Sequence, residues 1–285
     1  MIYLFGQLLF SIVFIQGMRY AQIRHAKMAL VAAINYLIAV VLSLLFCFWP
    51  GEVPASFNLT AIGLGAANGT VFFLTFFVQL AAYRIAGTGI SIALASSSVI
   101  VPVVVAHLLW PTIEWMSTLR WLAVLLIPVA MYLMRPTHSK IRRLTLKADG
   151  VLLLLFVMAG LANLFHKLVT VFAEEPSHPQ YRVGLFAAAA LGSGVWALMQ
   201  CKWPNRLELS WGLVLGTSNA LALVLVLLGL GALGAVVFFT TSGPLVIILT
   251  LVTGRMLWRE QITRRQGLGI CAAIMVVVLT NLPVQ

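Results

Sequence analysis

Residues 28–48 read MALVAAINYLIAVVLSLLFCF, a run without a single charged side chain. A helix that crosses the hydrocarbon core of a bilayer needs about 20 consecutive, mostly apolar residues, so this run predicts a membrane-spanning helix. Nine further apolar runs occur along the chain, at 2–18, 61–82, 86–109, 119–134, 150–172, 182–200, 210–228, 230–253 and 266–282. Together they predict an all-α integral membrane protein with ten transmembrane helices.

The composition of the 285-residue chain excludes an ordinary soluble domain. Its residues are 62% hydrophobic and only 9% charged, whereas soluble proteins carry about 25% charged residues. Ten spans leave no segment long enough for a soluble catalytic or ligand-binding domain. The shortest break, at Gly229, Leu230 and Gly231, allows only a very tight turn between the eighth and ninth spans.

Small residues recur at four-residue intervals in several spans. Examples are Ala61, Gly65 and Gly69 in the third run, and Gly184, Ala188 and Gly192 in the seventh. Such stripes let helices approach closely in lipid, so they predict a tightly packed bundle.

Basic residues are concentrated in alternate loops. The odd-numbered loops hold 15 Lys and Arg, and the even-numbered loops hold two. The positive-inside bias therefore accounts for the net charge of +11 without a nucleic-acid partner. It places the odd loops in the cytoplasm and both termini outside. We expect the first run to be an uncleaved span, and the protein to be a multi-pass protein of a bacterial inner membrane.

The two halves of the chain resemble each other weakly. At a shift of 151 residues, Ala61, Leu64, Gly65 and Asn68 correspond to Gly212, Leu215, Gly216 and Asn219. Each half holds five spans, an odd number, so the second copy enters the membrane upside down relative to the first. We therefore expect two inverted five-helix repeats, 1–134 and 150–285, joined by a basic cytoplasmic linker at 135–149.

A second set of matched positions follows the fourth and ninth runs. Glu260, Thr263, Gln266 and Gly269 recur, at a shift of 146 residues, as Glu114, Ser117, Arg120 and Ala123. The pattern of Glu, Ser or Thr, Gln and Gly at three-residue intervals resembles the EamA-like family of the drug/metabolite transporter superfamily. Arg120 and Ala123 depart from the family pattern, and the termini-outside topology is opposite to that expected of most ten-span members. The resemblance implies a carrier that works by alternating access, most commonly as an exporter.

Sequence signatures of catalysis are missing from the chain. It contains no Gly-x-x-x-x-Gly-Lys-Ser/Thr loop, no His-Glu-x-x-His helix and no Gly-x-Ser-x-Gly elbow. Its histidines and cysteines show no metal-ligand spacing. We therefore expect no enzymatic activity, cofactor or metal. Because no carboxylate lies deep in a span, either coupling uses another group or the carrier is a uniporter or an exchanger.

Polar and aromatic residues inside the spans are the candidate substrate-binding groups. The set comprises Gln16, Asn68, Phe72, Gln79, Ser98, Asn163, Lys167, Asn219 and Thr241. Several share a helical stripe, as Asn68, Phe72 and Gln79 do. Asn68 and Asn219 are matched by the repeat, so we expect them on opposite sides of one central cavity.

Structural alternatives remain open for these residues. The amides could form interhelical hydrogen bonds, and the aromatic rings could pack or face lipid. Lys167 could extend to the membrane interface, or its ammonium could pair with an anionic group of the substrate. The hydroxyls near Pro102 and Pro244 could bond carbonyls freed by the prolines, line the substrate path, or do both.

The sequence thus predicts a secondary transporter of a small organic metabolite. The substrate is expected to be amino-acid-like or drug-like, and an anionic compound is one of the possibilities. The expected partners of the transporter are that small molecule and the lipid bilayer. The sequence leaves open whether the chain forms a homo-oligomer. An integral-membrane enzyme and a non-transporting membrane scaffold are the alternatives. A nucleophile and base within reach in a cavity would favour the enzyme, and a sealed core would favour the scaffold.

Overall fold

The computed structural model describes residues 2–47, 58–109, 117–135, 142–172, 178–200, 203–233 and 235–282, whose only regular secondary structure is helical. The helices are α1 (Ile2–Ile23), α2 (Met28–Cys47), α3 (Leu59–Ala86), α4 (Thr88–Ser97), α5 (Ile100–Leu109), α6 (Thr118–Met134), α7 (Arg142–Phe172), α8 (His178–Met199), α9 (Arg206–Leu233), α10 (Ala235–Trp258) and α11 (Arg264–Asn281). The all-α fold is as predicted.

Eight spans in the described residues are long and apolar enough to cross a membrane, with α4 and α5 counted as one. They involve α1, α2, α3, α4 with α5, α7, α8, α9 and α10. Helix α6 is apolar but shorter, and it contains Pro128. The chain therefore has the character of a multi-pass membrane protein.

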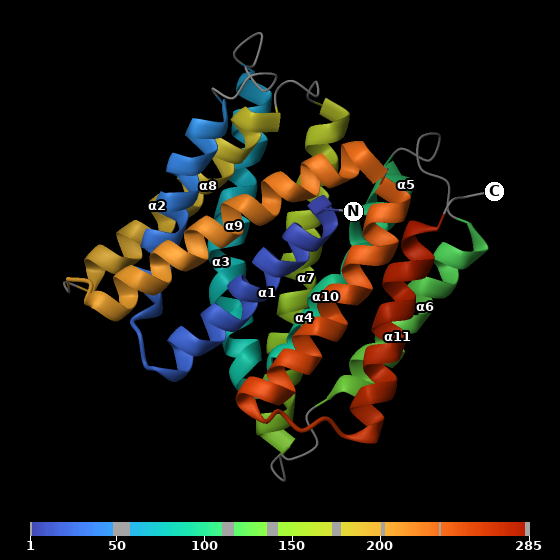
Figure 1. The fold of residues 1–285 in the computed structure, drawn as a ribbon. Coiled ribbons are helices and arrows are strands. Elements are labelled where there is room, and N and C mark those ends of the chain that lie inside the picture. Colours follow the sequence, from blue (N-terminus) through green and yellow to red (C-terminus); the bar gives the residue numbers. More distant parts are fainter. Residues whose placement is uncertain are drawn as a thin grey trace.

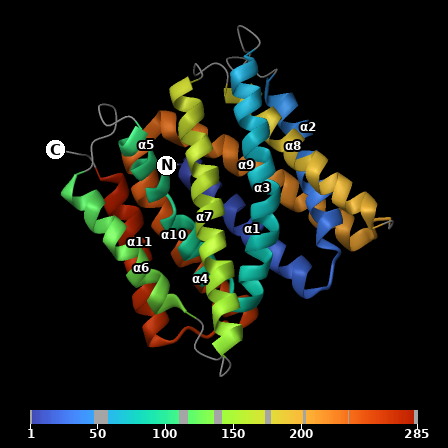
Figure 2. The same cartoon turned by 180° about the vertical axis from the view of Figure 1, so that it is seen from behind.

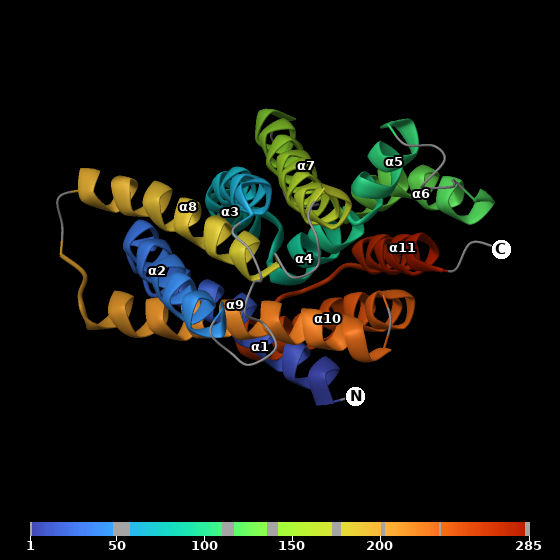
Figure 3. The same ribbon diagram turned by 90° about the horizontal axis from the view of Figure 1, so that it is seen from above.

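The helices form a bundle of two groups with three helices between them (Figures 1 and 3). Helices α2, α3, α8 and α9 lie at one end, and α5, α6, α10 and α11 lie at the other. Helices α1, α4 and α7 lie between the two groups, and the view from behind shows α3 and α7 side by side (Figure 2). Helix α1 packs on α9, α7 packs on α3, and α6 packs on α11.

The small-residue stripes lie in the closest helix contacts, as predicted. A Cβ atom added to Gly69 of α3 would lie 2.1 Å from the carbonyl oxygen of Leu185 in α8. The neighbouring contact of Gly65 is with the carbonyl of Tyr181 in the same helix. Gly216 of α9 approaches the carbonyl of Asn35 in α2 in the same way, at 2.5 Å. No larger residue fits these positions without moving a backbone.

The predicted tight turn at Gly229–Gly231 is wrong. Helix α9 continues through these residues to Leu233, and α10 begins at Ala235. Gly229 instead makes room for the ring of Phe238, because an added Cβ atom would lie 2.3 Å from that ring. The glycine serves a close helix contact within a continuous helix.

The fourth predicted span is divided into α4 and α5. Pro102, in the first turn of α5, has no backbone N–H to continue a helical ladder. At the break the Ser97 hydroxyl donates to the carbonyl of Leu94 at 2.8 Å, and the Ser98 hydroxyl donates to that of Ala95 at 2.6 Å. The hydroxyls thus bond carbonyls at the break, but not the Ser98 carbonyl, four residues before Pro102, which instead accepts from the N–H of Val101 at 2.9 Å.

Matched capping residues begin α6 and α11. The Thr263 hydroxyl accepts from the backbone N–H of Gln266, and the Gln266 side chain accepts from the backbone N–H of Thr263, which completes a capping box. Ser117 caps α6 through the N–H of Arg120. The Thr263 and Gln266 positions of the repeated motif therefore define where a helix starts.

Candidate central cavity

A cavity occupies the centre of the bundle. It consists of two adjoining spaces of about 420 and 300 Å³, which share six lining residues. The shared residues are Gln7, Phe14, Gln79, Ser96, Asn219 and Gly243. The complete lining comes from α1, α2, α3, α4, α7, α9, α10 and α11, together with Val99 between α4 and α5.

Uncharged hydrogen-bonding groups and aromatic rings line this cavity. The amides belong to Gln7, Gln79, Asn163, Asn219 and Asn281, the hydroxyls to Ser11, Tyr36, Thr75, Ser96 and Ser242, and the phenyl rings to Phe14, Phe72 and Phe76. Among the described lining residues there is no Lys, Arg, His, Asp or Glu. The cavity offers hydrogen bonds and flat apolar surface without a fixed charge.

Gln7 presents an unsatisfied amide to the cavity. Its side chain is 8% exposed, and its Nε2 donates to the hydroxyl of Ser11 at 2.9 Å. Its Oε1 is buried without a hydrogen-bond partner. An unpaired buried acceptor costs about 1–3 kcal/mol, so a rotation of the side chain that lets Oε1 accept a hydrogen bond from a ligand would remove that penalty.

Four of the predicted binding residues lie in this lining, namely Phe72, Gln79, Asn163 and Asn219. Gln79 donates to the hydroxyl of Tyr83 at 2.8 Å, which fixes its orientation. Asn163 donates to the hydroxyl of Ser98 at 3.3 Å, so Ser98, itself outside the lining, helps to orient the lining residue Asn163.

Asn68 occupies a different environment from Asn219. Its side chain is fully buried, and it donates to the carbonyl of Ala162 in α7 at 3.2 Å and to the hydroxyl of Tyr181 in α8 at 2.5 Å. The Tyr181 hydroxyl lies 3.0 Å from Nδ1 of His166. Asn68 therefore joins α3 to α7 and α8, and it is outside the cavity lining.

Gln16 joins α1 to α10. Its Nε2 donates to the hydroxyl of Thr253 at 2.7 Å, and its Oε1 accepts from Nε1 of Trp258 at 2.6 Å. Both ends of the amide are used, and Gln16 is outside the cavity lining. The geometry is that of an interhelical hydrogen bond.

Lys167 and Thr241 are also outside the lining residues. Both are partly buried. Lys167 lies one turn beyond Asn163 on α7, and Thr241 directly precedes the lining residue Ser242 on α10.

Sequence reasoning missed several lining residues, chiefly Gln7, Ser11 and Phe14 of α1 and Asn281 of α11. The α1 residues carried a usable signal, because a spacing of three to four places them on one face of a helix. Asn281 carried a weaker signal, because it is the last residue of its helix, where a polar side chain is ordinary.

Glu260, the acidic residue of the repeated motif, lies at the N-terminus of α4. Its carboxylate accepts hydrogen bonds from the backbone N–H of Thr88 at 2.8 Å, the hydroxyl of Thr88 at 2.9 Å and the N–H of Gly89 at 3.3 Å. Gly87, the preceding residue, has no side chain to cap the helix and adopts a φ of 83°. Glu260 therefore supplies the cap from the α10–α11 connection.

This cap has a consequence for the cavity, because α4 contributes Ile92, Ala95 and Ser96 to the lining. A residue of the second half of the chain thus holds in place a wall supplied by the first half. The corresponding Glu114 lies outside the described residues.

Comparison with models of known protein families found no match, and comparison with curated proteins found none either.

Proposed function

We propose that this chain is a secondary transporter that moves a small organic metabolite across the membrane by alternating access. The observation that carries the proposal is the central cavity of about 420 Å³, whose polar groups converge from both halves of the chain. Carriers built from repeats bind substrate where the repeats meet, near the middle of the membrane. Export is the direction that the resemblance to the EamA-like family favours.

The ten-span architecture of two inverted repeats belongs to the same proposal. In the two repeats α1 corresponds to α7, α2 to α8 and α3 to α9. Pairwise packing supports this correspondence. The contact of α3 with α8 matches that of α9 with α2, and the contact of α3 with α7 matches that of α9 with α1. Helices α3 and α9 are both 28 residues long. Both begin after an asparagine whose side chain accepts from a backbone N–H three residues later, Asn58 in one and Asn205 in the other.

The glycine contacts favour a shift of 147 residues between α3 and α9, where the sequence comparison used 151. Gly65 and Gly69 contact α8, and Gly212 and Gly216, each 147 residues further on, contact α2. The capping asparagines are also 147 residues apart. In this register Asn219 corresponds to Phe72, which lines the same cavity. Asn68 is one helical turn away from that position.

The substrate that fits this cavity is an uncharged compound with N–H or O–H donors and a flat apolar part. Burying an isolated charge among uncharged groups is strongly unfavourable, and no described lining residue could pair with one. Phe14, Phe72 and Phe76 offer surface for the apolar part, and Gln7 and Asn219 offer amides for the polar part. We therefore favour a neutral metabolite over the anionic one that pairing with Lys167 would require.

The alternative of an integral-membrane enzyme has less support. Ser11, Ser96 and Ser242 could act as nucleophiles, but a nucleophilic serine needs an adjacent base. No described lining residue is a histidine, a lysine or a carboxylate. A scaffold without transport activity has no evident use for a polar cavity at its centre.

A thermal-shift screen of the purified protein against neutral and charged metabolites tests the proposal, because a ligand that binds only the folded form raises the apparent stability. Compounds that stabilise the protein are then measured for uptake into vesicles. We expect Asn219→Leu to abolish both effects. Ser210→Leu is the matched control, because Ser210 is exposed on the same helix. Vesicles that show no uptake of any stabilising compound would contradict the transporter assignment.

A further inference from the structure

A second cavity, of about 380 Å³, lies between α6 and α7 and shares no lining residue with the central one. Its lining is mostly apolar: Leu94 of α4 and Leu152 of α7 are buried, and α6 contributes the partly buried Met131 and the exposed Pro128. Arg135, which directly follows α6, and Asp149, about two turns into α7, also belong to its lining. The cavity is therefore amphipathic, with a long apolar part and a short charged part.

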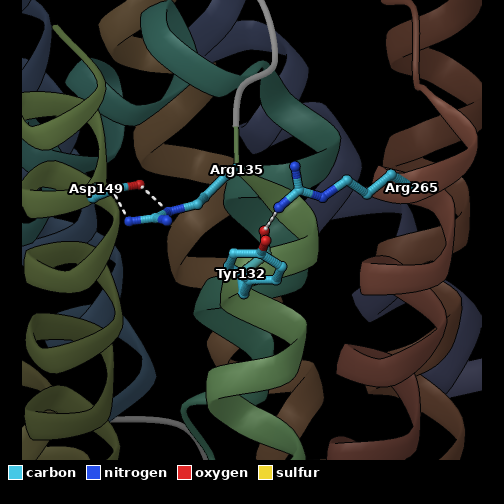
Figure 4. A network of polar contacts seen from close by, with 4 residues as sticks. All are labelled: Tyr132, Arg135, Asp149 and Arg265. Carbon is cyan, nitrogen blue, oxygen red and sulfur yellow. Dashed lines mark hydrogen bonds and ion pairs between the residues drawn. The ribbon is translucent and has the colours of Figure 1, made fainter. Parts of the chain in front are cut away.

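Two arginines flank Tyr132 at the charged end (Figure 4). The Arg135 guanidinium donates to Asp149, with Nε at 2.8 Å from Oδ1, and lies 5.7 Å from the centre of the Tyr132 ring. The Arg265 guanidinium, from α11, lies 4.5 Å from the same ring and donates to the Tyr132 carbonyl at 2.7 Å. Both cations are thus held in place beside one aromatic ring.

The cavity also has an open side. A Cβ atom added to Gly150, in the lining, would meet nothing within 4 Å. Leu153 of the lining is 52% exposed and Tyr132 is 58% exposed. Large apolar side chains that are exposed on membrane-type helices face lipid, so this opening is on the bilayer side of the molecule.

The charge around the cavity is positive. Within the lining, Arg135 and Asp149 pair with each other, and the excess positive charge comes from outside it: Arg265 lies against the lining residue Tyr132, and the exposed Lys147 lies two residues before Asp149. The hydrogen bonds that Arg135 donates to Asp149 raise the pKa of the Arg135 guanidinium, which therefore stays charged. A guanidinium offers five N–H donors in a planar fork that matches the oxygens of a phosphate.

We propose that this cavity binds an anionic phospholipid from the leaflet next to the basic loops. Its phosphate lies against Arg265 and Arg135, and one acyl chain enters the apolar part between α6 and α7. Basic pockets between transmembrane helices on the side of the basic loops suit anionic lipid head groups. A soluble anion would use the arginines but gain nothing from the apolar lining, and a zwitterionic lipid would bring a second cation toward them.

The test is a titration of the purified full-length protein with phosphatidylglycerol, followed by native mass spectrometry. Phosphatidylcholine and inorganic phosphate are titrated in parallel. Three variants are compared with the unaltered chain: Arg265→Gln removes one phosphate ligand, Gly150→Leu fills the apolar opening, and Arg255→Gln removes an exposed charge from the end of α10, away from the cavity. The unfolding temperature without lipid checks that each variant is folded.

We expect one tightly retained phosphatidylglycerol and weaker retention of phosphatidylcholine. Arg265→Gln should weaken phosphatidylglycerol binding by about tenfold or more, because a hydrogen bond to a charged group contributes at least that factor. Gly150→Leu should weaken both lipids, and Arg255→Gln should weaken neither. Equal losses in Arg255→Gln and Arg265→Gln, unchanged binding in Gly150→Leu, or displacement of the lipid by excess inorganic phosphate would each overturn the proposal.

Discussion

Two asparagines that look equivalent in the sequence have different roles in the structure. Asn68 is fully buried and bonds α7 and α8, whereas Asn219 lines the central cavity. The sequence correctly predicts that both asparagines lie inside long helices. The partner of each amide could not be predicted, because a rotation or shift of one turn decides whether an amide meets a neighbouring helix or a cavity.

Replacing each asparagine by leucine should separate these roles. Asn68→Leu should lower the free energy of unfolding by on the order of 1 kcal/mol, as expected for an interhelical hydrogen bond, and leave ligand affinity nearly unchanged. Asn219→Leu should reduce affinity and leave stability nearly unchanged. Unfolding in detergent and ligand titration measure the two quantities. The reverse pattern would place the binding site at Asn68.

Gln7 should show a conflict between stability and binding. Gln7→Leu removes a buried acceptor that has no partner, so the unfolding free energy should stay equal or rise, by up to about 1–3 kcal/mol. The same change should weaken any ligand that stabilises the unaltered protein. A variant that is both less stable and fully able to bind would show that the Gln7 amide serves packing only.

At the scale of helices, the apolar runs predicted where helices form, because each needs enough apolar length to cross a bilayer. The pattern did not predict the break between α4 and α5 or the continuation of α9 to Leu233. At the first, Ser97 and Ser98 form local hydrogen bonds to carbonyls three residues earlier, and at the second a tertiary contact is made, because Gly229 of α9 packs against Phe238 of α10. The cap that Glu260 gives to α4 is equally beyond a local pattern, because it joins residues 172 positions apart.

The close contact between α3 and α8 can be tested with two glycines of the same helix. Gly69→Ala places a methyl group against the carbonyl of Leu185, so it should destabilise the protein by about 1–3 kcal/mol. Gly63→Ala is the matched control, because nothing lies within 4 Å of an added Cβ atom and alanine favours the helix. Equal unfolding temperatures for the two variants would contradict the packing described for α3.

The contribution of the Glu260 charge to the stability of the protein should be measurable. Glu260→Gln keeps the shape of the side chain but removes the negative charge from the N-terminus of α4, which should cost about 0.3–1 kcal/mol at low ionic strength. Unfolding in low and high salt checks this expectation. A loss that does not shrink in high salt would point to hydrogen-bond geometry as the whole contribution.

For the whole molecule, the distribution of Lys and Arg predicts that the odd-numbered loops lie in the cytoplasm and that both termini lie outside. The connections at 24–27 and 259–263, which carry or adjoin several arginines, both lie in the lower part of the view in Figure 1. Reporter fusions that are active only outside the cytoplasm should be active at Gln285 and inactive at Lys140. Activity at Lys140 instead would invert the assignment.

The claim that the chain carries a solvent-accessible substrate site at its centre is tested most directly by cysteine accessibility in intact membranes. The background replaces Cys47, Cys201 and Cys271 by serine, and Asn219→Cys and Asn68→Cys are added separately. A small hydrophilic thiol reagent should label the Asn219→Cys variant when applied from either side, because alternating access opens the cavity to both in turn. It should fail to label the Asn68→Cys variant. If the reagent labels the folded Asn219→Cys variant from neither side, the transporter proposal is contradicted.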